Sequence, residues 1–496
     1  MTAPGTVRLA RSSILNLLGQ GLPLLAALVA IPRLIEGLGT ERFGVLTLAW
    51  VLIGYFSLFD FGLGRALTQL VSRHIGEGHA LAPAVSWMAL LLMSVLGAVG
   101  AIALALSTPW LVRSGLNLTP ALHDEALWSV LLLAACIPVV IVTAGLSGIL
   151  AAFQRFGVIN AIRAPMGVLA FIAPLLTLPF SGRLVPVIAT LVILRLLAFV
   201  AHAVACRRLL PPLARALFTD VAAVRPLFQL GAWMTLTNLV SPLMLYLDRF
   251  IIASMLSVTA VAYYATPYEM VTRLLFVSGA IGAVLFPAFA RSYASDRGAL
   301  GSLLARGSKY VGLVLFPTML VIVAFAPEGL AWWLDDEFAR ASTPVLRVLA
   351  VGVFVNGIAQ VFLALIQGVG RPDVTAKFHL LELPVYVVAL WWAVHTHGIV
   401  GAAWVWTGRV LLDALLLGWF ARRLMPDAHA LFARLTAAVA FSVVALVVPL
   451  AFAALGLRAV LVALVAALYV TGSWRMVLSD AERQAITNRL RPAAVR

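Results

Sequence analysis

Long runs of apolar residues alternate with short polar segments along almost the whole chain of 496 residues. A helix needs about 20 mostly apolar residues to cross the hydrocarbon core of a bilayer. By this measure the pattern predicts fourteen spans, at 13–32, 44–64, 85–108, 127–151, 165–181, 185–206, 229–255, 262–286, 310–326, 343–367, 378–395, 398–420, 433–454 and 457–474. If the last two are not spans, twelve remain, and the two termini still lie on the same side of the membrane. The predicted fold class is an all-α polytopic membrane protein with 12–14 transmembrane helices.

Composition supports this fold class, because 63% of the residues are hydrophobic and only 11% are charged. An average soluble domain has about 25% charged residues. A cytosolic enzyme, a secreted protein and a disordered scaffold are therefore excluded. The N-terminal pattern of Arg8 and Arg11 before an apolar run could also be a signal peptide, but no clear small-residue cleavage site precedes Arg33. We interpret the run as the first span. Cys136 and Cys206 lie in apolar stretches and predict neither a disulfide nor a thiolate metal site.

Positive charge is concentrated in alternate loops. The chain carries 35 Lys and Arg against 20 Asp and Glu, a net charge of +15. With the N-terminus inside, 24 of these cations fall in cytoplasmic segments and 6 in outside segments. The positive-inside rule then places both termini in the cytoplasm. Basic residues in short loops between spans indicate an anionic membrane surface, and we expect no nucleic-acid partner.

The domain organisation is predicted from the loops and a faint repeat. No loop exceeds about 25 residues and no G-x-x-x-x-G-K-[ST] phosphate loop occurs, so this chain alone is not expected to use ATP. At an offset of 218 residues, Gln20 aligns with Asn238, which fits two six-helix lobes. We predict an N-terminal lobe at 1–206, a cytoplasmic linker at 207–228, a C-terminal lobe at 229–425, and extra spans with a basic tail at 426–496. The linker is either a short interfacial helix or a plain loop.

Ten Asp, Glu and Arg residues fall inside the first twelve predicted spans: Asp60, Asp248, Glu269, Glu382 and Asp413, and Arg195, Arg249, Arg273, Arg347 and Arg409. Each costs roughly 2.5–3.5 kcal/mol at the bilayer centre, so we expect them to face a bundle interior or a wet cavity. Arg273 lies about 17 Å into its span, near the midplane, and Glu269 lies one turn away on the same face. Asp248 and Arg249 lie near the outer end of the preceding span. These four residues form either one polar cluster in the outer half of the second lobe or two salt bridges that only lock helices together.

A second group of charges is predicted in the inner half of the membrane. Arg409 lies near mid-depth with Asp413 one turn below it, and Glu382 enters the adjacent span from the cytoplasmic side. We expect these three to meet, either as packing or as a functional group. Arg195 lies at mid-depth without an acid on its own helix. It is either a ligand contact or the partner of a distant carboxylate.

Three stretches resemble a known family. They are G39-T-E-R-F-G-V with F59-D-F-G-L-G-R-A-L; L247-D-R-F-I-I, then A262-Y-Y through R273 to F286-P-A-F-A-R; and Q367-G-V-G-R-P leading into G398-I-V-G-A-A-W. Their order and spacing, over roughly residues 10–425, are similar to those of the polysaccharide transporter, or Wzx-type, oligosaccharide flippases. That family belongs to the multidrug/oligosaccharidyl-lipid/polysaccharide exporter superfamily.

The resemblance implies a function. Such proteins move undecaprenyl-diphosphate-linked oligosaccharides from the cytoplasmic to the periplasmic leaflet of the bacterial inner membrane, for O antigen, capsule or exopolysaccharide synthesis. It implies alternating access coupled to proton or sodium entry, with no other cofactor. Membrane lipids surround the protein, and a polysaccharide polymerase and a chain-length regulator are its expected partners.

The resemblance also assigns roles to residues. Related lipid II flippases use an arginine of the eighth helix in their cavity, and Arg273 lies at the matching place. A cavity that accepts a diphosphate needs cations, and Arg offers a bidentate fork. We therefore predict substrate contacts for Arg273, followed by Arg249 and Arg195. The candidates for ion coupling are Asp248, Glu269 and Glu382. We expect no catalytic residue and no metal site.

Two other classes of function remain as alternatives. A multidrug or small-metabolite antiporter of the same superfamily would bind cations through acids, which the equal numbers of acids and arginines in the spans do not favour. A membrane glycosyltransferase or polymerase would be expected to present a large outer loop with catalytic acids or His, whereas the largest outer loops, 109–126 and 327–342, are short. A non-transporting scaffold would tolerate loss of the Arg273 charge.

Overall fold

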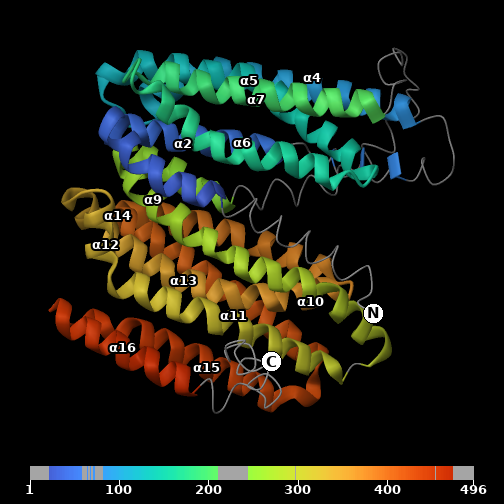
Figure 1. Cartoon of the computed structure of the whole chain (residues 1–496), viewed down its shortest axis with the longest axis vertical. Coiled ribbons are helices and arrows are strands. Elements are labelled where there is room, and N and C mark those ends of the chain that lie inside the picture. The colour runs from blue at the N-terminus through green and yellow to red at the C-terminus, as the bar shows by residue number, and fades with distance from the viewer. Residues whose placement is uncertain are drawn as a thin grey trace, which may run out of the picture. The chain divides into compact units, whose positions relative to one another are not determined.

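The structure is a computed structural model that describes residues 22–58, 64, 67–68, 71–72, 82–209, 244–296, 298–452 and 454–472. Within these ranges the regular structure is helical and no strand occurs (Figure 1). In the first part of the chain the helices are 22–38, α2 (Thr40–Leu58), α4 (Ala82–Trp110), α5 (His123–Ala152), α6 (Phe156–Thr177), α7 (Leu184–Leu209) and 244–255. In the second part they are α9 (Val258–Thr272), α10 (Phe276–Ser295), α11 (Ala299–Ala324), α12 (Ala326–Trp333), α13 (Asp336–Gly368), α14 (Pro372–Leu424), α15 (His429–Val447) and α16 (Leu455–Gly472).

Membrane-crossing helices account for most of the described chain. Ten of the described helical segments are long and apolar enough to cross a bilayer. The last two predicted spans are both present as helices, α15 and α16. The predicted span at 262–286 is the continuous segment of α9, a short 3₁₀ turn and α10. The chain is therefore a multi-pass membrane protein of the all-α class.

Two of the predicted spans, 378–395 and 398–420, both lie within α14. Gly398 interrupts this helix with φ +60° and ψ −144°. Glycine adopts a positive φ without the steric cost that a Cβ imposes. The break falls where the sequence predicts the outer turn between these two spans, so α14 consists of two helices joined at Gly398.

The described residues divide into two compact units. The first comprises Met1–Thr266 with Leu383–Ala402, and the second comprises Pro267–Glu382 with Ala403–Arg496. Helices α9 and α14 each contribute residues to both units. The predicted linker at 207–228 lies outside the described residues beyond position 209, so the boundaries of the predicted lobes stay a prediction.

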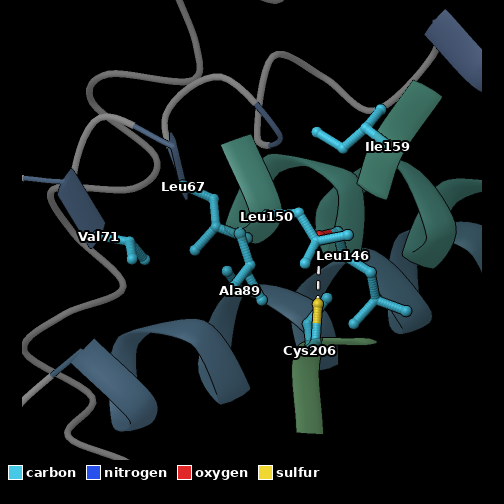
Figure 2. Close-up of a cluster of buried hydrophobic side chains, with 9 residues drawn as sticks. Leu67, Val71, Ala89, Leu146, Leu150, Ile159 and Cys206 are labelled. Atoms are coloured by element: carbon cyan, nitrogen blue, oxygen red, sulfur yellow. Dashed lines mark hydrogen bonds between the residues drawn. The ribbon is translucent and has the colours of Figure 1, made fainter. Parts of the chain in front are cut away.

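In the first unit α5 is the central helix and packs against α2, α4, α6 and α7. Figure 2 shows the apolar cluster that joins several of these helices near one end, with Leu146 and Leu150 from α5, Ala89 from α4 and Ile159 from α6. The Cys206 thiol of α7 donates a hydrogen bond to the Leu146 carbonyl over 3.4 Å. This thiol therefore serves packing, as expected of a free buried cysteine.

In the second unit α13 has the corresponding place and packs against α10, α11, α12 and α15. Within its most apolar stretch 78% of the residues are buried, against 50% in α11 and 22% in α15. A helix that is apolar on all sides can be surrounded by other helices. A small residue also lets α14 approach α13, because a Cβ on Gly352 would lie 2.7 Å from the Trp406 ring of α14.

We predict that Gly44→Ala destabilises the first unit. A Cβ on Gly44 would collide with the backbone carbonyl oxygen of Val258, which cannot move aside as a flexible side chain can. Overpacking of this kind costs about 1–3 kcal/mol. We expect a lower thermal midpoint for the purified protein in detergent. Gly157→Ala is the matched control, because no atom lies within 4 Å of its added Cβ. Equal midpoints for both variants would show that α2 does not depend on this close approach.

Candidate functional site

Arg273 lies at an interruption of a membrane-crossing helix. Helix α9 ends at Thr272, and a 3₁₀ turn over Arg273–Leu275 precedes α10. Pro267, six residues earlier, lacks the N–H that a regular helix needs. Short 3₁₀ stretches within helices often mark hinges or functional positions. The structure thus places the predicted substrate residue at a local break in backbone regularity.

The Arg273 guanidinium forms a loose ion pair. Its Nη2 lies 3.4 Å from Oε2 of Glu269. The two side chains remain 30% and 40% exposed, respectively. A guanidinium has five N–H donors in a fixed fork, which suits it to contacts with an anionic group. The pair therefore combines a cation and an anion at a position that is still accessible.

Asp248 and Arg249, by contrast, are wholly enclosed, with side-chain exposures of 0%. Asp248 Oδ2 accepts a hydrogen bond of 2.7 Å from the Tyr264 hydroxyl. Arg249 Nη1 donates to the Leu245 carbonyl over 3.0 Å and lies 3.4 Å from Asp248 Oδ1. The Arg249 guanidinium also lies 5.5 Å from the centre of the Tyr246 ring. This network uses both charges internally, which is the arrangement of a structural ion pair.

The predicted cluster of four outer charges is divided between the two units. Asp248 and Arg249 belong to the first unit, whereas Glu269 and Arg273 belong to the second. A single four-residue cluster therefore stays a prediction. So do a substrate contact by Arg249 and ion coupling by Asp248 or Glu269.

The inner charges come together within the second unit. Arg409 Nη1 lies 3.9 Å from Glu382 Oε2, and His379 Nε2 lies 3.8 Å from Asp413 Oδ1. His379 and Glu382 share one face of the first half of α14 at i, i+3 spacing, and the other two residues come from its second half. The spatial association of Glu382, Arg409 and Asp413 follows their predicted depth. Ion coupling by Glu382 stays a prediction.

Glu382 is the most enclosed member of this group, with a side chain only 1% exposed. Within the described residues, neither of its carboxylate oxygens has a hydrogen-bond partner. Ligand atoms of His379, Glu382 and Asp413 lie within 4.8 Å of one another, a set that could hold a metal ion. The guanidinium of Arg409 beside Glu382 already supplies positive charge, which disfavours a divalent cation in the same space.

Arg195 lines a cavity of about 300 Å³ between α5, α6 and α7, entirely within the first unit. Arg163 and His202 lie along the same cavity. Sequence reasoning identified Arg195 and its mid-depth position. It did not identify Arg163 and His202 as neighbours of Arg195, because Arg163 lies on a different helix and no pattern in the sequence links the three residues.

The polar residues of the first stretch, G39-T-E-R-F, have a structural role. Arg42 of α2 forms two hydrogen bonds of 2.9 Å with the Glu125 carboxylate of α5. Glu125 also accepts from the backbone N–H of Leu184 at the start of α7, over 3.0 Å. The hydrogen-bonded Glu125 raises the pKa of Arg42. The pair thus joins three helices of the first unit at their predicted outer ends.

The third stretch, Q367-G-V-G-R-P, forms the turn between α13 and α14. Gly370 has φ +83°, and the Arg371 N–H donates to the Ile366 carbonyl over 3.1 Å. The Arg371 guanidinium donates to both carboxylate oxygens of Asp373, at 3.0 and 3.3 Å, and this raises the pKa of Arg371. The motif therefore ends one helix and starts the next.

Sequence reasoning missed two polar partners of the second unit. His379 was not selected because a lone histidine near a span end carries no pattern. Arg458 was not selected as a candidate, and the structure shows its side chain 7% exposed and paired with Glu328. It also donates to the Ala324 carbonyl over 2.8 Å. This pairing ties α16 to the turn between α11 and α12.

Comparison with known proteins identifies the family. A family model described as "Polysaccharide biosynthesis protein" matches residues 9–293, more than half of the chain. The chain belongs to the polysaccharide biosynthesis protein family. It is 30% identical over 414 residues to a "Putative O-antigen transporter" of Shigella flexneri, covering 84% of this chain and 98% of that protein. It is also 25% identical over 209 residues to the teichuronic acid biosynthesis protein TuaB of Bacillus subtilis (strain 168), covering 40% of this chain and 41% of TuaB.

Solved structures show which fold this polysaccharide biosynthesis protein has. It matches the lipid II flippase MurJ in an inward closed conformation with a TM-score of 0.68 at 13% identity, over 94% of this chain and 99% of MurJ. It matches an inward-facing MATE family multidrug transporter of the MOP superfamily with a TM-score of 0.67 at 17% identity, over 82% of this chain and 98% of that one. At these identities the likeness concerns the fold alone, and it supports the predicted all-α class of polytopic membrane proteins.

We predict that Asp248→Asn destabilises the protein strongly. The change removes the negative charge beside the enclosed Arg249 guanidinium, and breaking a buried pair in this way costs about 3–5 kcal/mol. The expected result is a large loss of folded protein after heating in detergent, measured by size-exclusion chromatography. Asp124→Asn removes an exposed carboxylate from α5 and is the control, with little change expected. A mild effect of Asp248→Asn would contradict a structural role for the pair.

Proposed function

We propose that this protein is a flippase that moves undecaprenyl-diphosphate-linked oligosaccharide repeat units from the cytoplasmic to the periplasmic leaflet, for the synthesis of a surface polysaccharide. The observation that carries the proposal is the alignment with a putative O-antigen transporter over 98% of that protein's length. The MurJ-like fold supports it, because MurJ is itself named as a flippase of a lipid-linked substrate.

The charges support the same function on physical grounds. A diphosphate and hydrated sugars cannot cross about 30 Å of hydrocarbon unaided. Arginines at the membrane interior offset the diphosphate charge, and their fork geometry suits two phosphate oxygens. Arg273 in the second unit and Arg195 in the first are partly exposed arginines at predicted mid-depth. We propose that they contact the diphosphate while the two lobes alternate between inward-open and outward-open forms.

The proposed cellular setting follows from this function. The protein resides in the bacterial inner membrane with both termini in the cytoplasm, as the distribution of Lys and Arg predicts. A polysaccharide polymerase and a chain-length regulator then use the translocated repeat unit and are its proposed functional partners.

A multidrug antiporter is the alternative supported by fold alone, through the MATE structures. The family match and the O-antigen relative favour polysaccharide precursors over drugs. They equally favour a transporter over a membrane glycosyltransferase or polymerase, so we assign no enzymatic activity.

The test is deletion of the gene in its own bacterium, followed by mass spectrometry of undecaprenyl-diphosphate-linked oligosaccharides. We expect a repeat unit to accumulate and the wild-type gene to clear it. Arg273→Ala should clear it about ten- to hundredfold more slowly, because a hydrogen bond to a charged group contributes about 1.5–3 kcal/mol. Arg273→Lys should be intermediate, since it keeps the charge and loses the fork.

Arg340→Ala is the matched control, because Arg340 is an exposed arginine near the start of α13. All variants are first checked for equal amounts in the membrane. Absence of any lipid-linked oligosaccharide in the deletion strain would overturn the proposed function. Normal clearance by Arg273→Ala would overturn the role of Arg273 while leaving the function in place.

We further propose that translocation is coupled to protons through the group of His379, Glu382, Arg409 and Asp413. Two carboxylates in a poorly hydrated site are stabilised by nearby positive charge, and Arg409 supplies one such charge. A protonated His379, 3.8 Å from Asp413, supplies the second. Hard cations such as Na⁺ bind best to oxygen ligands alone. An imidazole and a guanidinium among the carboxylates therefore favour a proton as the exchanged ion.

We expect His379→Gln to uncouple the transporter, because Gln keeps a polar side chain that cannot carry a proton at neutral pH. In proteoliposomes containing a pH-sensitive dye, adding a lipid-linked oligosaccharide should move protons with the wild-type protein and not with His379→Gln. Replacing Na⁺ by choline should have no effect. His395→Gln, at the outer turn, is the control. Substrate movement that requires Na⁺ and tolerates His379→Gln would contradict the proposal.

A further inference from the structure

The cavity between α5, α6 and α7 is lined by an arginine that forms no structural ion pair within the described residues. Arg195 lines it at the middle of α7. Among the described residues, no hydrogen bond or ion pair is formed by the Arg195 guanidinium. The ionisable neighbour that interacts with it is the thiol of Cys136, which is uncharged at neutral pH. An arginine in hydrocarbon without an anion is costly, so a ligand that brings negative charge would be stabilised there.

The rest of the cavity lining also favours a negatively charged ligand. Arg163, near the start of α6, adds a second guanidinium, and no Asp or Glu is among the lining residues. Ser147 of α5 contributes a hydroxyl. His202 shares the cavity with its Nδ1 placed 2.8 Å from the Ala198 carbonyl, which leaves Nε2 for a ligand. The polar groups therefore comprise two cations and neutral hydrogen-bonding groups.

The position of these groups defines a path into the membrane. His202 lies two helical turns after Arg195 on α7, about 10 Å nearer the predicted cytoplasmic end. Arg163 lies near that same end, because α6 begins there. A charged group could enter beside Arg163 and reach Arg195 at mid-depth. The volume of about 300 Å³ is at the lower end of the range for small-molecule sites and suits a headgroup better than a whole oligosaccharide.

We infer that this cavity is a phosphate-binding subsite that receives the phosphate-bearing headgroup of a lipid from the cytoplasmic side. Arg195 and Arg163 would bind the phosphate oxygens, and Ser147 and His202 would hydrogen-bond to neighbouring hydroxyl or phosphate groups. The inference deepens the proposed function, because the diphosphate of the transported lipid has this chemistry. The phosphate of an anionic phospholipid has it as well, and the experiment separates the two sources.

The test is a binding measurement on the purified full chain in nanodiscs of zwitterionic phosphatidylcholine, with radiolabelled farnesyl diphosphate as the probe. The Arg273→Ala background isolates this cavity from the other proposed diphosphate contact. Arg195→Gln should weaken binding by about tenfold or more, the equivalent of one charged hydrogen bond. Arg163→Gln should weaken it less, because Arg163 is exposed at the surface.

Two further variants separate binding from folding and from general surface charge. Ser147→Leu fills the cavity without touching either arginine and should also prevent binding. Arg208→Gln removes an exposed arginine from the last turn of α7 and should leave binding unchanged. Thermal midpoints of all variants show whether each is folded. Equal affinity of the wild-type, Arg195→Gln and Ser147→Leu proteins for the probe would overturn the inference.

Competition identifies the source of the phosphate. If added phosphatidylglycerol displaces the probe as well as unlabelled farnesyl diphosphate does, the cavity is a site for phospholipid headgroups. If only the diphosphate displaces it, the cavity belongs to the transported lipid. Binding does not require translocation. A deletion strain without accumulated oligosaccharide would therefore contradict the proposed function. Binding of the probe that does not depend on Arg195 would contradict this inference.

Discussion

The bilayer interior offers no water to solvate a charge or a backbone polar group, and this constraint governs the structure. Helices satisfy the backbone internally, so the described part of the chain is helical wherever it is regular. Charged side chains are stabilised by partners inside the protein. Arg249 has Asp248, and Arg458 has Glu328 together with the Ala324 carbonyl. The Arg458–Glu328 pair also fixes α16 against α12, and the hydrogen bond from Tyr264 to Asp248 fixes the helix 244–255 against α9.

The same constraint makes the remaining polar groups informative. Arg195 faces a cavity without a partner among the described residues, and Glu382 is enclosed without a hydrogen bond to either carboxylate oxygen. Arg273 forms an ion pair with Glu269, and its side chain stays 30% exposed. Structural packing does not account for these costs. A transporter that binds an anion and exchanges an ion does account for them, because the transported species then bind beside Arg195 and Glu382.

Each unit holds its polar site on a scaffold organised around one helix. In the first unit α5 contributes to the cavity wall and also packs against α2, α4, α6 and α7. In the second unit α13 is the most enclosed helix and packs against the Trp406 ring of α14, near Arg409. The groups proposed to bind and exchange ions are therefore placed by side chains that are themselves closely packed, which is what a defined binding geometry requires.

Within the described residues, the sequence by itself determined the membrane-crossing helices, including the last two, because the apolar length needed to cross a bilayer is a local property of the sequence. It also predicted similar depths for Glu382, Arg409 and Asp413, which were expected to meet and do so. It missed His379, and it did not bring Arg163 and His202 to Arg195. Such groupings depend on how each helix is rotated about its axis, and a helix that is apolar on nearly all sides carries no stripe to fix that rotation. Only the packing of α5, α6 and α7, and the reversal of α14 at Gly398, decided which polar side chains share a site.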